Sequence, residues 1–166
     1  MSSLYYNHKN RFITLTDLAV GDIPDRLDIR GEKFIIKPEF HITLVAVKYI
    51  AEIIDRNNTE KIQLEIVDEF YKFTEKFPLT EYKLLNDVRF VAIEDNKTII
   101  IMVKLKGIES FFETLEKKYH KALPLQPTHI TLYTLPTDTF GIPICSYEEL
   151  KIISTPIIIP KLQALV

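Results

Sequence analysis

The stretch His-Ile-Thr-Leu occupies residues 41–44 and occurs again, unchanged, at residues 129–132. Each copy lies in a segment rich in β-branched and aromatic residues, 40–49 and 129–134, and such residues favour β-strands. The chain has four histidines, so a chance match of this length between two of them is rare. The repeat therefore predicts two equivalent strands, one in each half of the chain.

The alternation of side chains along a strand gives the repeat a chemical meaning. His41 and Thr43 are two residues apart and share one face of the first strand, as His129 and Thr131 do in the second. The apolar residues between and after them point the other way, toward a core. If the two strands lie side by side or face each other, two imidazoles and two hydroxyls converge on one anion-sized site.

Two histidines and two threonines suit the cleavage of a phosphodiester. Histidine, with a pKa near 6.5, takes up or releases a proton near neutral pH, so a pair can act as general base and general acid on opposite sides of the phosphorus. Threonine hydroxyls can donate to the non-bridging oxygens, as in an oxyanion hole. We therefore predict His41 and His129 as catalytic residues and Thr43 and Thr131 as phosphate-binding residues, with no metal or cofactor required.

Tyr133 extends the face of the second motif by the same period of two, and Val45 holds the matching place in the first strand. An aromatic ring there would stack on a base or line the groove, which makes Tyr133 a predicted substrate-binding residue. The alternative is a structural tyrosine at the edge of a sheet.

Hydrophobic periodicity and turn residues predict the remaining elements. Apolar residues at spacings of three or four predict helices over 62–77 and 108–119, the first begun by Asn58 or Thr59 and ended by Pro78. The other expected elements are a strand over 11–15, a long loop or poorly formed helix over 17–33, a hairpin of strands 88–93 and 98–105 around a turn at 94–97, and a short edge strand at 157–159. This order indicates an α+β fold.

Length and composition indicate one folded domain over residues 1–166. Hydrophobic residues make up 46% of the chain and charged residues 27%, as in ordinary globular proteins, and no low-complexity linker divides it. A net charge of -2 and a pI near 6.1 exclude a global basic field that attracts long nucleic acid. A nucleic-acid substrate is therefore expected to be small or held locally in a cleft.

Cysteine usage and the N-terminus bear on the compartment. The single Cys145 can form neither an intramolecular disulfide nor a multi-cysteine zinc site, and the first residues lack the layout of a secretory signal. The longest apolar run, 99–103, is far shorter than the roughly 20 residues that cross a bilayer. We expect a cytoplasmic monomer with no membrane span and no obligate protein partner.

Two His-x-Thr motifs, each followed by a hydrophobic residue and one in each half of a small domain, resemble the 2H phosphoesterase superfamily, which includes bacterial 2'-5' RNA ligase-like proteins and cyclic nucleotide phosphodiesterases. The resemblance implies a bilobal, pseudo-two-fold α+β fold with two antiparallel sheets around a central groove and helices on the outside. It also implies a metal-independent phosphodiesterase, a hydrolase of 2',3'-cyclic phosphates, 2'-5' linkages or cyclic (oligo)nucleotides. It leans toward His129 as the base.

Two other functions fit the same residues. One is a non-catalytic nucleotide-binding module that uses the same groove, and the other is a structural protein in which the repeat only records a duplication. For the enzyme and for the binding module, the expected partner is a small nucleotide or a short RNA or oligonucleotide.

The other polar residues receive structural interpretations. His120, near the end of the second helix beside lysines, is interpreted as a helix cap, and His8 as part of a frayed N-terminus. Cys145 is interpreted as a buried or half-buried small residue rather than a nucleophile. Single basic residues such as Lys37 are assigned to the solvated surface.

Overall fold

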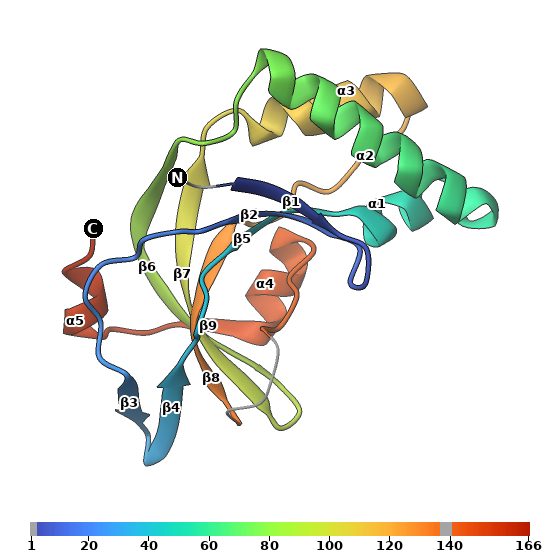
Figure 1. The fold of residues 1–166 in the computed structure, drawn as a ribbon. Helices are drawn as coiled ribbons and strands as arrows, with labels where there is room; N and C mark the ends of the chain where they lie inside the picture. Colours follow the sequence, from blue (N-terminus) through green and yellow to red (C-terminus); the bar gives the residue numbers. More distant parts are fainter. Residues whose placement is uncertain (1–2, 137–140) are drawn as a thin grey trace.

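The computed structural model describes residues 3–136 and 141–166. In these residues a nine-stranded sheet, whose recorded strand pairs are antiparallel, combines with five α-helices (Figure 1). The predicted α+β class is confirmed. None of the described helices is both long and apolar enough to cross a bilayer.

The bounds of the elements are as follows. The strands are β1 (Ser3–Asn7), β2 (Phe12–Thr16), β3 (Arg26–Ile29), β4 (Glu32–Ile36), β5 (Ile42–Ala46), β6 (Tyr82–Ile93), β7 (Asn96–Leu105), β8 (His129–Leu135) and β9 (Ser154–Pro156). The helices are α1 (Val47–Ile54), the 3-10 turn η1 (Arg56–Asn58), α2 (Thr59–Lys76), α3 (Ile108–Tyr119), α4 (Tyr147–Ile153) and α5 (Pro160–Gln163).

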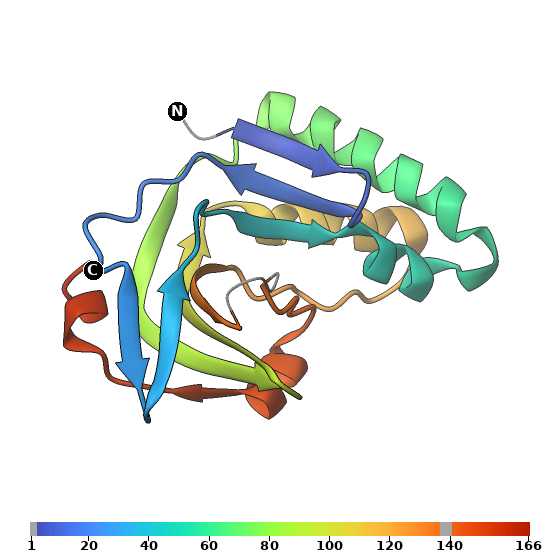
Figure 2. The same ribbon diagram turned by 60° about the horizontal axis from the view of Figure 1, so that its bottom comes forward.

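The strand order is β1-β2-β5-β8-β7-β6-β9, and the β3–β4 hairpin attaches to β8 through β4. The two strands that carry the repeated motif, β5 and β8, are therefore neighbours at the centre of the sheet. They meet at the pair Ile42 and Ile130, the second residue of each motif. Figure 2 shows the β3–β4 hairpin projecting at the end of the sheet away from α2 and α3.

The main core lies between the sheet and the layer of α1, α2 and α3. Helix α2 turns Ile66 and Phe70 inward, and the Phe70 ring packs edge-to-face on Phe111 of α3 with centroids 5.0 Å apart. Ile130 and Leu132 of the second motif belong to this core. Ile42 and Leu44 of the first motif also belong to it, so the apolar residues of both motifs point to the core as predicted.

A smaller apolar cluster covers the opposite face of the central strands. It contains Ile100 and Met102 of β7, Ile142 and Ile144 of the segment that leads into α4, and Leu150 of α4 itself. Helix α4 lies well apart from α2 and α3 in both views (Figures 1 and 2). This second cluster flanks the polar half of the second motif, because Met102 and Ile100 are the partners of His129 and Thr131.

The sequence predicted a frayed N-terminus. In the described residues Ser3–Asn7 instead forms β1, which pairs with β2 along its whole length. The turn between the strands is held by the Asn7 side chain, whose Oδ1 accepts from the backbone N–H of Lys9 at 2.9 Å and of Asn10 at 3.3 Å. Asn side chains commonly close turns in this way. His8 lies exposed in the turn with its ring against Tyr6.

The predicted loop over 17–33 is wrong in its second part, where β3 and the start of β4 form a hairpin. Arg30 and Gly31 make the turn with φ of 56° and 80°, the two positive values that a type I′ turn requires. The strand predicted over 40–49, which carries the first motif, is too long. The observed strand β5 spans Ile42–Ala46, and α1 begins at Val47.

The C-terminal edge strand is also displaced from its predicted place. Residues 154–156, not 157–159, pair with β6, and α5 begins at Pro160. Helix α4 before it was not predicted, although Ser146 and Glu149 carry its signal: the Ser146 Oγ accepts from the Glu149 N–H at 3.1 Å, an N-terminal cap. The 88–105 hairpin is confirmed, with a turn of two residues, 94–95, instead of four. The helices over 62–77 and 108–119 are confirmed within a few residues.

Candidate functional site

One cavity of about 90 Å³ is lined by both histidines and both threonines of the repeated motifs. We call it the central cavity; Asn10, Phe12, Lys37, Gln126 and residues 141–143 complete its wall. The structure therefore brings together the four side chains that the sequence predicted to converge. Their chemical roles stay predictions.

The register of β5 and β8 explains the convergence. The strands are antiparallel and pair at Ile42 and Ile130, so the histidine and threonine of each motif flank this one pair. Since Ile42 and Ile130 both point into the main core, their neighbours on either side point to the cavity face. The two imidazoles and the two hydroxyls thus line the same cavity.

Each motif strand is irregular at the same place. Along β2, the consecutive residues Ile13 and Thr14 pair with Val45 and Thr43, which leaves Leu44 as an extra residue in β5. The same irregularity occurs between β7 and β8, where the extra residue is Leu132. A bulge of this kind breaks the alternation of faces and re-aims the side chains that follow.

The prediction that Tyr133 contacts substrate is wrong, and the bulge at Leu132 is the reason. Past the bulge the side chain of Tyr133 points to the main core, where it is fully buried, and its hydroxyl donates to the Pro24 carbonyl at 2.7 Å. Burial, and then the Asp25 carboxylate, raises the pKa of Tyr133 to about 12. Its ring packs in the core and cannot stack on a base.

His129 is the more buried of the two histidines, with 7% of its surface exposed. Its Nδ1 lies 3.2 Å from the Pro127 carbonyl, which can only accept, so Nδ1 carries the proton and Nε2 keeps the lone pair. Burial lowers the pKa of His129 to about 4, partly opposed by this hydrogen bond and assisted by the nearby His41 imidazole. His129 is therefore a neutral ring of defined tautomer, suited to accept a proton.

His41 is half-buried directly before β5, and two charged groups, Lys37 and Glu39, act on it. Burial lowers its pKa from the usual value near 6.5, the Lys37 ammonium lowers it further, and the Glu39 carboxylate acts in the opposite direction. The two histidines therefore differ: His129 is buried in β8, whereas His41 is half-buried and lies near a cation and an anion.

Three residues that the sequence did not single out as functional contribute to the cavity. Lys37, assigned from sequence to the solvated surface, is fixed beside β8 by its backbone N–H, which donates to the Leu132 carbonyl at 2.8 Å. Gln126 accepts from the Ala46 N–H at 2.8 Å. A Cβ at Gly141 would lie 3.0 Å from the Thr131 Oγ1, so the backbone there closes directly over that hydroxyl. Lys37 and Gln126 lie within four residues of a motif in the sequence, but only the fold shows that they line the cavity.

The remaining interpretations from sequence have these outcomes. His120 is the C-cap of α3 in a left-handed conformation, as predicted for a cap. Burial, and then the Glu149 carboxylate, raises the pKa of the Cys145 thiol to about 11, which disfavours a thiolate nucleophile. Within residues 3–136 and 141–166, no group of three or more His, Cys, Asp and Glu side chains is placed to hold a metal ion.

Comparison with known proteins gives no relative from which to assign a function. No protein-family model matches the chain, and no curated protein or solved structure matches it either.

Proposed function

We propose that the chain is a metal-independent phosphodiesterase of the 2H type that hydrolyses 2',3'-cyclic phosphates, 2'-5' linkages or cyclic (oligo)nucleotides. The observation that carries the proposal is the central cavity itself, in which two imidazoles and two threonine hydroxyls from separate motifs face one space. A structural repeat has no need to place its polar halves on a shared cavity.

The asymmetry of the two histidines supports His129 as the base and His41 as the acid. His129 Nε2 takes a proton from water, and the water oxygen forms a bond to phosphorus. The bond from phosphorus to the departing ribose oxygen breaks, and that oxygen takes a proton from the His41 imidazolium. The products are a phosphomonoester and an alcohol, and proton exchange with solvent restores both rings. Binding of an anionic phosphodiester favours the protonated form of His41.

The threonines and Lys37 supply the electrostatic part. The Thr43 and Thr131 hydroxyls donate to non-bridging oxygens, whose charge grows in the transition state, and each is rigid at χ1. Lys37, on the cavity wall, adds a positive charge that offsets the phosphate. Hydroxyl donors held in a partly buried site stabilise an anion more than the same donors in water.

The sheet also supports the two-lobed arrangement of this family. Strands β1, β2 and β5 form one half, and β8, β7, β6 and β9 form the other, with the central cavity at their junction. The matching bulges at Leu44 and Leu132 give both halves the same local geometry at the motif. These similarities are what a pseudo-two-fold domain would contain.

A product assay tests the proposal. The purified chain is offered 2',3'-cyclic nucleotides, 2'-5' oligoadenylates and cyclic dinucleotides, with and without EDTA, and we expect EDTA-insensitive turnover of at least one class. His41→Ala and His129→Ala should each lower kcat by a hundredfold or more, on the order expected for loss of a general acid or base. His120→Asn is the matched control, because it changes a histidine outside the cavity. Full activity in either active-site variant refutes the proposal.

A leaving group that needs no proton separates the acid from the base. A nucleoside p-nitrophenyl phosphate releases nitrophenolate, so His41→Ala should recover most of the wild-type rate on this substrate, whereas His129→Ala should not. The reverse pattern would exchange the two roles.

One observation favours the non-catalytic alternative, a nucleotide-binding module. The pKa values of both histidines are lowered, so both rings are mostly neutral at pH 7 before a ligand binds. Tight binding of cyclic or 2'-5' nucleotides without turnover from pH 4 to pH 8 would establish that alternative.

A further inference from the structure

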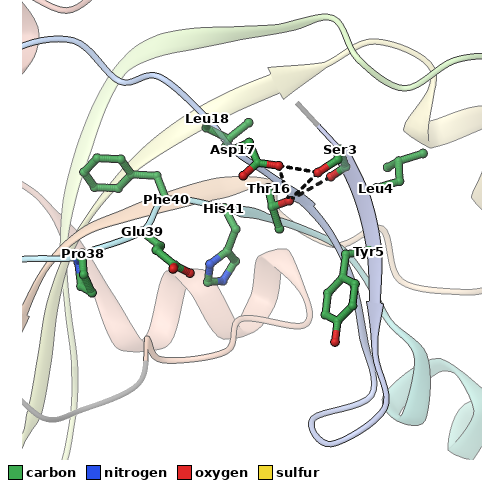
Figure 3. Close-up of a pocket in the computed structure, with 10 residues that line it drawn as sticks. All are labelled: Ser3, Leu4, Tyr5, Thr16, Asp17, Leu18, Pro38, Glu39, Phe40 and His41. Carbon is green, nitrogen blue, oxygen red and sulfur yellow. Dashed lines mark hydrogen bonds between the residues drawn. The ribbon is translucent and has the colours of Figure 1, made fainter. Parts of the chain in front are cut away.

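A second and larger pocket adjoins the central cavity. Its volume is about 530 Å³, and His41 lines both spaces. We call it the outer pocket; Figure 3 shows its wall, made by β1, the end of β2 and residues 38–41. If a ligand has its phosphate in the central cavity and extends past His41, the rest of it would therefore reach the outer pocket.

The outer pocket is produced by an excursion of the backbone. Ile36 pairs with Tyr133 and Ile42 pairs with Ile130, so five intervening residues on one side face two on the other. The surplus forces residues 38–40 away from β8, and these three residues line the pocket. Both ends of the excursion are anchored on the strand that carries His129 and Thr131. The outer pocket and the phosphate site therefore keep a fixed relation.

Charge is divided between the two spaces. The central cavity has the Lys37 ammonium and the two imidazoles, whereas the ionisable groups of the outer pocket apart from His41 and Tyr5 are the carboxylates of Asp17 and Glu39. Within the described residues no lysine or arginine lines the outer pocket. An anionic group is thus attracted to the first space and repelled from the second.

The Asp17 carboxylate is held in place by two hydroxyls. Its Oδ2 accepts from Ser3 and, at 3.2 Å, from Thr16 (Figure 3). These hydrogen bonds lower the pKa of Asp17, which keeps it ionised at neutral pH. The pocket therefore has a fixed negative charge on the wall formed by β1 and β2.

Two aromatic rings, with Leu4, Leu18 and Pro38, supply the apolar part of the wall. Figure 3 shows Phe40 and Tyr5 on opposite sides of the His41 imidazole, and 53% of the Tyr5 surface is exposed. Nucleobases stack on such rings whatever their sequence, and their N–H groups donate to carboxylates. The wall chemistry thus matches a planar, uncharged ring system with N–H donors.

We propose that the outer pocket binds the nucleoside whose ribose oxygen departs from phosphorus and excludes a second phosphate from that side. This inference rests on the proposed function, because it is the acid His41, between the two spaces, that protonates the departing oxygen. The substrate class is thereby narrowed to a single phosphodiester next to an otherwise uncharged nucleoside. Cyclic oligonucleotides and nucleosides with an additional 5'-phosphate are disfavoured.

Binding measurements test the inference separately from turnover. Calorimetry compares a nucleoside 3'-monophosphate with the same nucleoside 3',5'-bisphosphate at low and high salt. Each carboxylate near the extra phosphate should weaken binding about threefold at low salt, so the wild-type protein should prefer the monophosphate by on the order of tenfold. Asp17→Asn, which preserves acceptance from Ser3 and Thr16, should reduce this preference about threefold. Asp28→Asn, an exposed change outside both spaces, is the matched control.

The two proposals fail in different ways. A wild-type protein that binds the bisphosphate as tightly as the monophosphate, or an Asp17→Asn variant with unchanged preference, overturns the inference whether or not turnover is seen. Absence of turnover across the substrate panel, with the binding preference intact, overturns the enzymatic proposal and leaves the pocket assignment supported.

Discussion

Acidification is expected to destabilise the protein through His129. In the folded state the pKa of this imidazole is about 4, because burial disfavours its charged form, while an unfolded chain has the ordinary value near 6.5. Between these values the unfolded state binds the proton and the folded state does not. The free energy of unfolding therefore falls as the pH falls through 6.5, and the loss is complete below about pH 4.

The magnitude follows from the separation of the two pKa values. The gap between 6.5 and about 4, at about 1.4 kcal/mol per pH unit, corresponds to about 3 kcal/mol. This is a large share of the 5–15 kcal/mol that typically stabilises a domain. Replacing His129 with asparagine removes the titrating ring and keeps an N–H that can donate to the Pro127 carbonyl.

Urea denaturation at pH 7, 6, 5 and 4 measures the effect. The wild-type protein should lose about 3 kcal/mol more than His129→Asn between pH 7 and pH 4. His120→Asn serves as the control, since asparagine also tolerates the left-handed conformation at this exposed C-cap, and it should follow the wild-type pH dependence. Equal pH dependence in the wild type and His129→Asn would refute the account of His129 as a buried neutral ring.

Three further predictions concern the cavity and the core residue Tyr133 beside it. Gly141→Ala places a Cβ 3.0 Å from the Thr131 Oγ1, so kcat/KM should fall about tenfold with little change in urea midpoint; an unchanged kcat/KM would mean that this hydroxyl does not hold the phosphate. Tyr133→Phe removes the bond to Pro24 and should cost about 1 kcal/mol of stability while kcat/KM stays constant, and a rise in KM would restore a substrate role for the ring. The pH profile of kcat/KM should rise through about 4 as His129 loses its proton and fall through a value below 6.5 as His41 does, giving an acidic optimum that a maximum above pH 7 would contradict.

The sequence could predict those parts of the molecule that depend on local pattern. The stripes of α2 and α3 and the alternation within each motif are periodicities that a single sequence displays, and they placed His41 and His129 on one kind of face. The convergence of the two motifs was also predictable, because the two tetrapeptides have the same sequence. The sequence was sufficient to predict the four cavity residues of the motifs, because their chemistry and the two-residue period of a strand both select the histidine and threonine of each motif.

What could not be predicted depends on partners distant in the chain. The bulge at Leu132 arises from the register with β7, and it alone sends Tyr133 to the core instead of the cavity. Lys37 reaches the cavity because the chain before β5 follows β8, which no local pattern shows. The β3–β4 hairpin depends on Arg30 adopting a left-handed conformation beside Gly31, a turn without the usual Asn-Gly or Asp-Gly signal.

The backbone excursion at residues 38–40 has a consequence for how this scaffold can be altered. Both of its ends are tied to β8, and its middle pairs with neither Thr43 nor Thr131, so its length does not change the pairing of β5 with β8. A longer or shorter segment would remodel the outer pocket and leave Thr43, His129 and Thr131 in place, whereas His41, the last residue before the pair Ile42–Ile130, would move with it. Residues 38–40 are accordingly the part of the outer pocket that a protein engineer could change in length, whereas Tyr5 and Asp17 are fixed on β1 and at the end of β2.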